Sequence, residues 1–329
     1  SLLLGMYNIG LQNAIAAGTV ETTTWFSMFL YGLLVTLPKI VVAYAVGLGI
    51  EFTVAQWKNE EIHEGFLVSG ILIPMIVPVG CPLWVLALAT AFAVIFAKEV
   101  FGGTGMNIVN VALIARAFIF FAYPSVISGD SVWVATDTIC GLGSSVDGYT
   151  CATALQYVAN GAAPVGASGE LLTSCDMIFG FMPGSIGETS VVAIALGAAL
   201  LLYTGVASWK TMLSVFVGGI AMLFVFQNKM PEAMPLWHNL LLGGFCFGAV
   251  FMATDPVTSA RTETGKYIYG FAIGAMTIII RVMNPGYPEG MMLAILLLNV
   301  FAPLIDYCVV AMNISKRKKR WAKAERSAK

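Results

Sequence analysis

The chain has 329 residues, of which 58% are hydrophobic and 11% are charged, and its mean hydropathy is +0.85. Soluble domains carry about 25% charged residues, so the composition excludes an ordinary soluble protein and indicates an integral membrane protein surrounded by lipid. The formal net charge of −1 gives no electrostatic reason to bind nucleic acid, and we expect none as a partner. The sequence begins with Ser1 inside an apolar run, so we expect the natural chain to have further residues before it.

Cysteine and histidine spacing gives no sign of a metal centre. The six cysteines include no CxxC pair, and His63 and His238 are far apart. Zinc and haem sites need grouped ligands, so we expect no metal cluster built by this chain alone. The chain also lacks a G-x-G-x-x-G fingerprint followed by an acidic residue, so it has no signal for binding a dinucleotide.

Long apolar segments recur along the whole chain. A membrane-spanning helix needs about 20 mainly apolar residues, and the sequence predicts an all-α protein with about ten such segments. They lie roughly at 1–18, 26–50, 64–79, 82–98, 107–123, 189–208, 211–227, 239–254, 268–283 and 291–312. The short segments 64–79 and 82–98 are separated by Pro-Val-Gly-Cys-Pro, which indicates a tight hairpin of broken helices.

Hydropathy divides the chain into a first half at 1–123, a polar loop at 124–188, a second half at 189–312 and a basic tail at 313–329. Five helices per half would give the halves opposite orientations, an arrangement typical of transporters. We therefore expect two inverted five-helix halves.

The distribution of Lys and Arg predicts the orientation in the membrane. The basic run at 316–320 predicts a cytoplasmic C-terminus. Counting back through the predicted spans places further basic residues on the cytoplasmic side, namely Lys58, Lys98, Lys210, Arg261 and Lys266. The 124–188 loop contains no Lys or Arg, so we expect it at the outer face.

A glycine-rich turn at 102–105 leads to Asn107 and Asn110. Glycines let the backbone approach a ligand closely, and asparagines three residues apart share a helix face. Their amides suit the edge of a flavin ring or a quinone carbonyl. The alternative is a cytoplasmic turn in which Asn107 is a helix N-cap.

Five charged residues fall at or near membrane depth. Arg116 and Lys39 lie inside predicted helices, where a charge is costly and indicates either a function or a buried partner. Glu51, Asp255 and Asp306 lie near predicted cytoplasmic helix ends, where carboxylates bind hard cations such as Na⁺ or relay protons. The alternative is that these three carboxylates cap or solvate helix ends.

The outer loop contains the polar stretch 147–153, which ends at Thr153. A hydrolase-type nucleophile needs a nearby base, usually His or Lys, and the loop has neither. A phosphate ester installed by another enzyme needs only an accessible hydroxyl, although an unmodified polar loop is the simpler interpretation. The turns at 182–188 and 284–290 are ordered by proline and glycine, and both could also form walls of a cofactor site beside Thr153.

Five motifs resemble one family of membrane proteins. They lie at 98–105, 116–124, 182–188, 251–257 and 287–296. In this order and number they resemble NqrB, the B-type membrane subunit of the Na⁺-translocating NADH:quinone reductase. Some of them are shared with RnfD, a subunit of the related ferredoxin:NAD⁺ complex. The resemblance covers essentially the whole chain.

The resemblance implies a covalent FMN, joined through its phosphate to Thr153. The family's attachment pattern is Asp-Gly-x-Ser/Thr-Gly-Ala-Thr, and four other residues match it, namely Asp147, Gly148, Thr150 and Ala152. Cys151 replaces the pattern's glycine. Residues 138–146 resemble an insertion flanked by Cys140 and Cys151, which leaves open a disulfide between these two or with Cys175.

The resemblance also implies roles for residues in the membrane. Asn107 and Asn110 match asparagines associated with a non-covalent riboflavin. Gly47 matches a position linked to quinone. The carboxylates that match positions linked to Na⁺ uptake are Glu51, Asp255 and Asp306.

The implied function is electron transfer from covalent FMN to riboflavin to quinone, coupled to Na⁺ translocation across a bacterial inner membrane. The implied partners are the other subunits of a six-subunit complex, including the NADH-oxidising subunit and another FMN-carrying subunit, together with a flavin transferase. Two alternatives remain: an RnfD-like subunit of a ferredoxin:NAD⁺ oxidoreductase, and a flavin-free channel or transporter.

Overall fold

The computed structural model describes residues 1–329 except 60, 62–64, 150, 230–234, 285 and 328–329. The described residues form α-helices with short π and 3₁₀ turns and contain no β-strand beyond isolated bridges. The predicted all-α class is therefore confirmed.

Within the described residues, four helical segments are long and apolar enough to cross a membrane, as expected for a multi-pass membrane protein. They are α2 (Trp25–Lys58), the segment Leu83–Phe101, α13 (Glu263–Met283) and the Met291–Trp321 part of α14 (Met291–Ser327). Leu83–Phe101 consists of α4 (Leu83–Ala93), the π-helical turn η1 (Val94–Lys98) and the 3₁₀ turn η2 (Glu99–Phe101).

The other apolar helices are shorter. They are α1 (Leu2–Ala16), α3 (Phe66–Met75), α5 (Val111–Ala122), α9 (Val191–Tyr203), α10 (Trp209–Val225) and α12 (Phe245–Phe247) with the π-helical turn η4 (Gly248–Met252). The ten residues of α3 extend only about 15 Å, about half of a hydrocarbon layer. Each predicted segment contains a helix, but these lengths do not establish that ten of them span the membrane.

Several helix pairs correspond between the two halves, although the extensive packing of α1 on α2 has no counterpart of similar extent between α9 and α10. In the first half α2 packs against α3 and α4, and α4 packs against α5. In the second half α10 packs against η4 and α13, and α13 packs against α14. The shared order supports a structural repeat, while the inversion of one half relative to the other stays a prediction.

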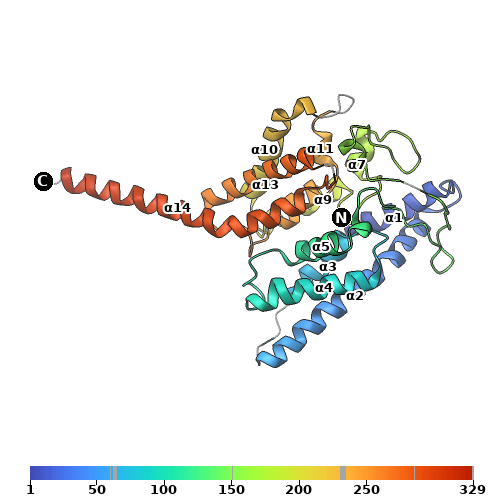
Figure 1. The fold of residues 1–329 in the computed structure, drawn as a ribbon, viewed down its shortest axis with the longest axis horizontal. Coiled ribbons are helices and arrows are strands. Elements are labelled where there is room, and N and C mark those ends of the chain that lie inside the picture. Colours follow the sequence, from blue (N-terminus) through green and yellow to red (C-terminus); the bar gives the residue numbers. More distant parts are fainter. Residues whose placement is uncertain (60, 62–64, 150, 230–234, 285, 328–329) are drawn as a thin grey trace.

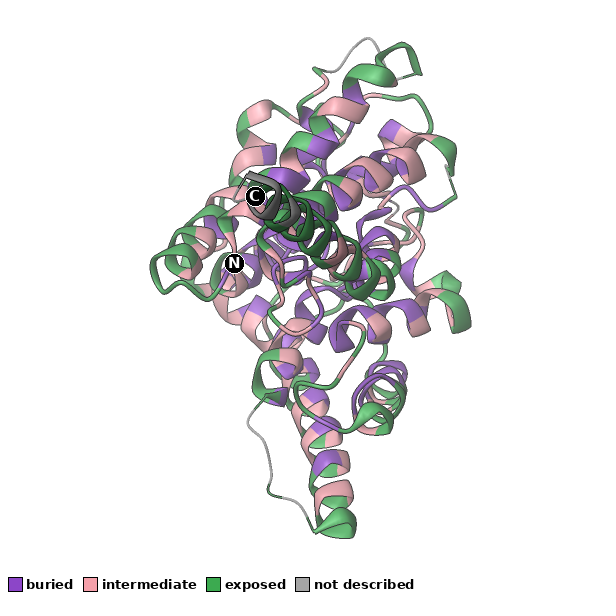
Figure 2. Cartoon of the chain, turned by 90° about the vertical axis from the view of Figure 1, so that its left-hand side faces the viewer, coloured by how far each residue is buried: buried purple, intermediate pink, exposed green. Residues whose placement is uncertain are grey.

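Glycines bring two helix pairs into backbone contact. A Cβ atom at Gly32 on α2 would lie 1.7 Å from the Met6 carbonyl oxygen on α1. A Cβ atom at Gly274 on α13 would lie 2.0 Å from the Val215 carbonyl oxygen on α10. Small residues at such crossings are typical of membrane helix packing. Figure 2 accordingly shows buried residues where the helices cross and exposed residues along the projecting part of α14.

The 124–188 segment and the C-terminus lie at opposite ends of the molecule (Figure 1). This segment includes α7 (Ala154–Ala159) and α8 (Ser174–Phe179). Buried amides on α1 hold it in place, because Asn13 donates to the Ala135 carbonyl at 2.8 Å and Asn8 donates to the Met182 carbonyl at 3.0 Å. The first helix therefore has a polar face that anchors the polar segment.

Candidate functional site

Thr153 is the N-cap of α7 and is half-buried. Its hydroxyl accepts from the Gln156 backbone N–H at 3.3 Å, and its own N–H donates to the Gly129 carbonyl at 2.9 Å. Threonine is a common N-cap because its oxygen satisfies a free N–H of the first turn. These two hydrogen bonds fix the position of the hydroxyl.

The residues before Thr153 form an exposed approach to it. Asp147 and Gly148 are exposed, Ala152 is half-buried, and Thr150 lies outside the described residues. Gly148 has a φ of +69°, a conformation that side chains rarely adopt. The exposed part of this stretch is available to an enzyme that would modify Thr153.

Cys151, which replaces a glycine of the family pattern, is buried beside Thr153. Its sulfur lies 3.9 Å from the Gly166 carbonyl oxygen. Burial raises the pKa of the Cys151 thiol, so it stays protonated and unreactive at neutral pH. The described structure has Cys140, Cys151 and Cys175 as free cysteines, and thus without the disulfide that the sequence left open.

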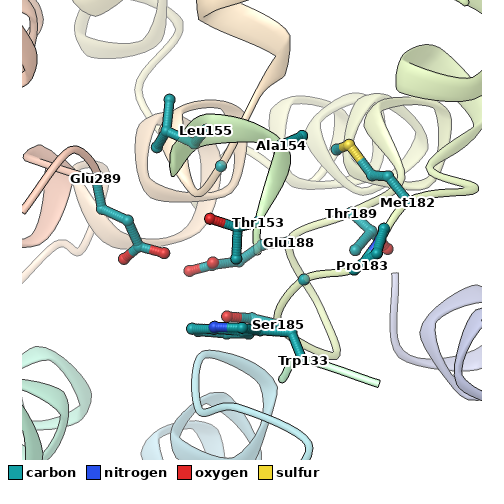
Figure 3. Close-up of a pocket in the computed structure, with 12 residues that line it drawn as sticks. Trp133, Thr153, Ala154, Leu155, Met182, Pro183, Ser185, Glu188, Thr189 and Glu289 are labelled. Carbon is teal, nitrogen blue, oxygen red and sulfur yellow. The ribbon is translucent and has the colours of Figure 1, made fainter. Parts of the chain in front are cut away.

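Two adjoining cavities meet at Thr153. One has a volume of about 210 Å³ and the other about 30 Å³, and both are lined by Thr153, Trp133 and Glu289. The larger cavity is also lined by residues 286–289 and the smaller one by the 182–188 turn. Figure 3 shows the Thr153 hydroxyl on the same side of the smaller cavity as the carboxylates of Glu188 and Glu289.

Arg116 joins the two turns that flank Thr153. It lies on α5 and forms ion pairs with both Glu188 and Glu289. The side chain of Arg116 is 3% exposed and that of Glu188 is 6% exposed. Burial raises the pKa of the Glu188 carboxyl, the Arg116 guanidinium opposes this shift, and the neighbouring Glu289 adds to it. Arg281 on α13 donates to the Glu289 carbonyl at 3.2 Å.

A third cavity, separate from the two at Thr153, has a volume of about 330 Å³ and lies between the two halves. Residues near the two π-helical turns contribute to it, including Lys98 at the end of η1 and Phe251 within η4. π-Helical turns are frequent at functional sites. The polar lining residues are Ser69, Lys98, Thr104, Asn107, Asn110, Thr254 and Asp255. The structure therefore brings both predicted riboflavin residues and one predicted Na⁺ carboxylate to a single cavity, named here the inner cavity.

The prediction that Asn107 and Asn110 share a face of one helix is wrong. The helix α5 begins at Val111, and Asn110, not Asn107, is its N-cap. The Asn110 side-chain oxygen accepts from the N–H groups of Ala112 and Leu113 at 3.0 and 3.2 Å. Its amide nitrogen donates to Asp255 at 3.2 Å. Asn110 therefore connects the start of α5 to the carboxylate of the other half.

Glu51 and Gly47 lie on α2, beside the inner cavity. Glu51 is buried and forms an ion pair with Lys98. Gly47 lies against Phe66, because a Cβ atom at this position would be 1.9 Å from the Phe66 ring. Gly47 is not among the described residues that line the inner cavity. The absence of a side chain at Gly47 instead leaves room for the Phe66 ring.

Asp306 has a different environment from the other two carboxylates. It accepts from the N–H groups of Arg261 and Thr262 at 2.8 and 3.0 Å and from the Thr262 hydroxyl at 2.6 Å. These bonds secure the N-terminus of α13, as the capping alternative predicted. Of the three carboxylates, only Asp255 is among the described lining residues of the inner cavity.

Lys39 has buried partners that the sequence did not reveal. Lys39 donates to the carbonyls of Pro78 and Val79 in the break between α3 and α4.

The sequence did not single out Trp133, which lines both Thr153 cavities. The available signal was a large aromatic residue in an otherwise small and polar stretch.

Residues 1–315 match the model of the family described as NQR2, RnfD, RnfE. The chain belongs to this family. Its similarity to three proteins, each named as the B-type subunit of a Na(+)-translocating NADH-quinone reductase, confirms the resemblance seen in the motifs. The protein of Chromohalobacter salexigens is 45% identical over 344 residues, covering 97% of this chain and 81% of that protein.

The other two relatives agree with this family membership. The Yersinia pestis protein is 44% identical over 327 residues, covering 97% of this chain and 77% of its own length. The Klebsiella pneumoniae subsp. pneumoniae protein is 47% identical over 305 residues, covering 90% of this chain and 71% of its own length. A family match across both halves is consistent with a site assembled from both of them.

Proposed function

We propose that the chain is the B-type membrane subunit of a Na⁺-pumping NADH:quinone oxidoreductase, with FMN esterified to Thr153 and riboflavin in the inner cavity. The names of the relatives support the reaction class. The cavities at Thr153 and the inner cavity support the proposed positions of the two flavins. We further propose a bacterial inner membrane, with the C-terminus cytoplasmic and 124–188 at the outer face.

The observation that carries the proposal is the position of the Thr153 hydroxyl at cavities walled by one turn of the 124–188 segment and one turn of the second half. A cavity of about 210 Å³ is below the range of about 300–1,000 Å³ that encloses a drug-sized ligand. It suits the ring of a flavin, with the ribityl chain and phosphate at the rim. The exposed stretch at Asp147 and Gly148 gives a flavin transferase access.

The inner cavity suits a non-covalent flavin. Its volume of about 330 Å³ falls within the range of ligand pockets, and Phe251 gives it an aromatic wall. Asn107 supplies an amide and Asp255 a carboxylate at its wall, and Asn110 orients this carboxylate by donating to it. A flat ring with polar edges needs this combination.

Bound flavins supply one- and two-electron transfer, and the chain's residues hold them apart and shield them from water. The NADH-oxidising subunit and a second FMN-carrying subunit would deliver electrons, and quinone would accept them near the cytoplasmic side. Coupling requires that Na⁺ affinity or access differ between redox states. Asp255 in the inner cavity and the Glu51–Lys98 pair beside it are the residues we assign to this linkage.

Denaturing electrophoresis of the complex from its natural host tests the covalent flavin. The wild-type subunit should give a fluorescent band under ultraviolet light, and Thr153→Val should remove it because the acceptor hydroxyl is lost. Thr173→Val is the matched control, since Thr173 is an exposed N-cap in the same segment. A missing wild-type band would refute the proposal, and a band that persists in Thr153→Val would move the attachment site.

The RnfD-like alternative predicts electron exchange with ferredoxin and no direct reduction of quinone. The family description includes both types, whereas the three relatives above carry the NADH-quinone reductase name. This favours the quinone-linked function. Activity of the purified complex with quinone and with ferredoxin separates the two.

A further inference from the structure

Three aromatic residues line the larger cavity at Thr153. They are Trp133, Phe120 and Tyr287. The rings of Phe120 and Tyr287 are packed together, with centroids 4.1 Å apart and planes at 50°. Trp133 lines both of the cavities that meet at Thr153. The cavity is therefore shaped by large flat side chains close to the predicted attachment point.

The Trp133 ring is held in one orientation. Its indole N–H donates to the Ser128 carbonyl at 2.9 Å, and the residue is only 3% exposed. The neighbouring residue Gly129 accepts the backbone hydrogen bond from Thr153 at 2.9 Å. The segment that fixes the indole therefore also fixes the attachment residue.

One face of the indole is turned toward the site. In Figure 3 Trp133 is seen edge-on, and the Thr153 hydroxyl and Glu188 lie over the same face of its ring. Flat aromatic rings attract each other most strongly in offset-stacked or edge-to-face arrangements. A ring tethered at Thr153 and entering the larger cavity would meet the indole.

We propose that Trp133 is a binding residue for the covalent flavin and stacks against its isoalloxazine ring in the cavity at Thr153. This inference rests on the proposed function and adds a contact that the attachment motif does not contain. Phe120 and Tyr287 complete the aromatic lining. Glu289, which lines both cavities, supplies an acceptor for a ring N–H.

Time-resolved flavin fluorescence of the whole complex tests the contact. A photoexcited flavin stacked on an indole takes an electron from it and returns it, which shortens the emission lifetime. A phenylalanine ring does not donate this electron. Trp133→Phe should therefore lengthen the emission lifetime several-fold. The emission of the Thr153 flavin is obtained by subtracting the signal of the Thr153→Val complex, which lacks only that flavin.

Trp84→Phe is the matched control. Trp84 is 61% exposed, packs on Tyr123 and is absent from the lining of both cavities. Its variant should keep the wild-type lifetime. If Trp133→Phe does not assemble, Trp133→Tyr replaces it and should lengthen the lifetime less, because a phenol quenches less strongly than an indole.

An unchanged lifetime in the Trp133 variant, with the fluorescent gel band intact, would overturn the stacking contact and leave Thr153 as the attachment site. A wild-type complex without a Thr153-dependent band would instead refute the proposed function. The two failures are therefore distinguishable.

Discussion

Gly47 on α2 affects the inner cavity indirectly, because its lack of a side chain makes room for the Phe66 ring. The Phe66 ring occupies the space where a Cβ atom would lie. Phe66 in turn packs beneath Lys98, whose ammonium nitrogen is 5.6 Å from the ring centroid. Lys98 lines the inner cavity, so a change at Gly47 reaches that cavity through Phe66.

We predict that Gly47→Ala destabilises the complex by about 1–3 kcal/mol through overpacking against Phe66 and releases part of the non-covalent riboflavin. Gly49→Ala is the matched control, because no described atom outside its own helix and chain neighbours lies within 4 Å of a Cβ atom there. The free energy of unfolding of the Gly49→Ala variant should be unchanged or higher by up to about 1 kcal/mol. Thermal unfolding in detergent and extracted riboflavin are the measurements; equal behaviour of the two variants would contradict this account.

At the residue scale a motif can single out one residue, whereas a role that depends on packing cannot be predicted from residue spacing. The family's attachment pattern singles out Thr153 as the flavin acceptor, which stays a prediction, and it gives no information on the N-cap or the cavities at this residue. The spacing of Asn107 and Asn110 suggested one helix face, but α5 begins only at Val111. Hydropathy cannot locate a helix start within a few residues, whereas a cap is determined by specific hydrogen bonds.

At the scale of elements, Arg116 connects α5 to two turns from distant parts of the chain. Its partners Glu188 and Glu289 are 72 and 173 residues away. The sequence showed a costly charge inside a helix, and it offered a partner carboxylate as one explanation. It could not name the partners, because they are brought together only by the packing of both halves.

We predict that Arg116→Gln destabilises the complex by about 3–5 kcal/mol, since it leaves buried carboxylates without their cation. The double variant Arg116→Gln/Glu188→Gln should recover part of this loss, because one of the two charges is also removed. The thermal unfolding midpoint of the purified complex in detergent is the measurement. A double variant no more stable than Arg116→Gln would argue against the pairing as the cause.

For the whole molecule, the Thr153 cavities lie beside the 124–188 segment, and the inner cavity lies near the residues predicted to be cytoplasmic. The all-α class and the helical segments followed from hydropathy, because apolar length alone selects them. The break between α3 and α4 was also predicted, from the short segments 64–79 and 82–98 and the prolines between them. The short α12–η4 segment was not predicted, because a broken helix has the same composition as a whole one. The inner cavity lies between α3 and η4, where the two halves meet.

Our main proposal is that this chain carries one flavin on Thr153, the N-cap of α7, which lies far from the projecting part of α14 (Figure 1). The most direct measurement is the intact mass of the denatured protein purified from its natural host. We predict a mass higher than that of the unmodified natural polypeptide by one FMN minus one water. This excess should be lost in Thr153→Val and retained in Thr173→Val. A wild-type protein with no such excess, or an excess that survives in Thr153→Val, would contradict it.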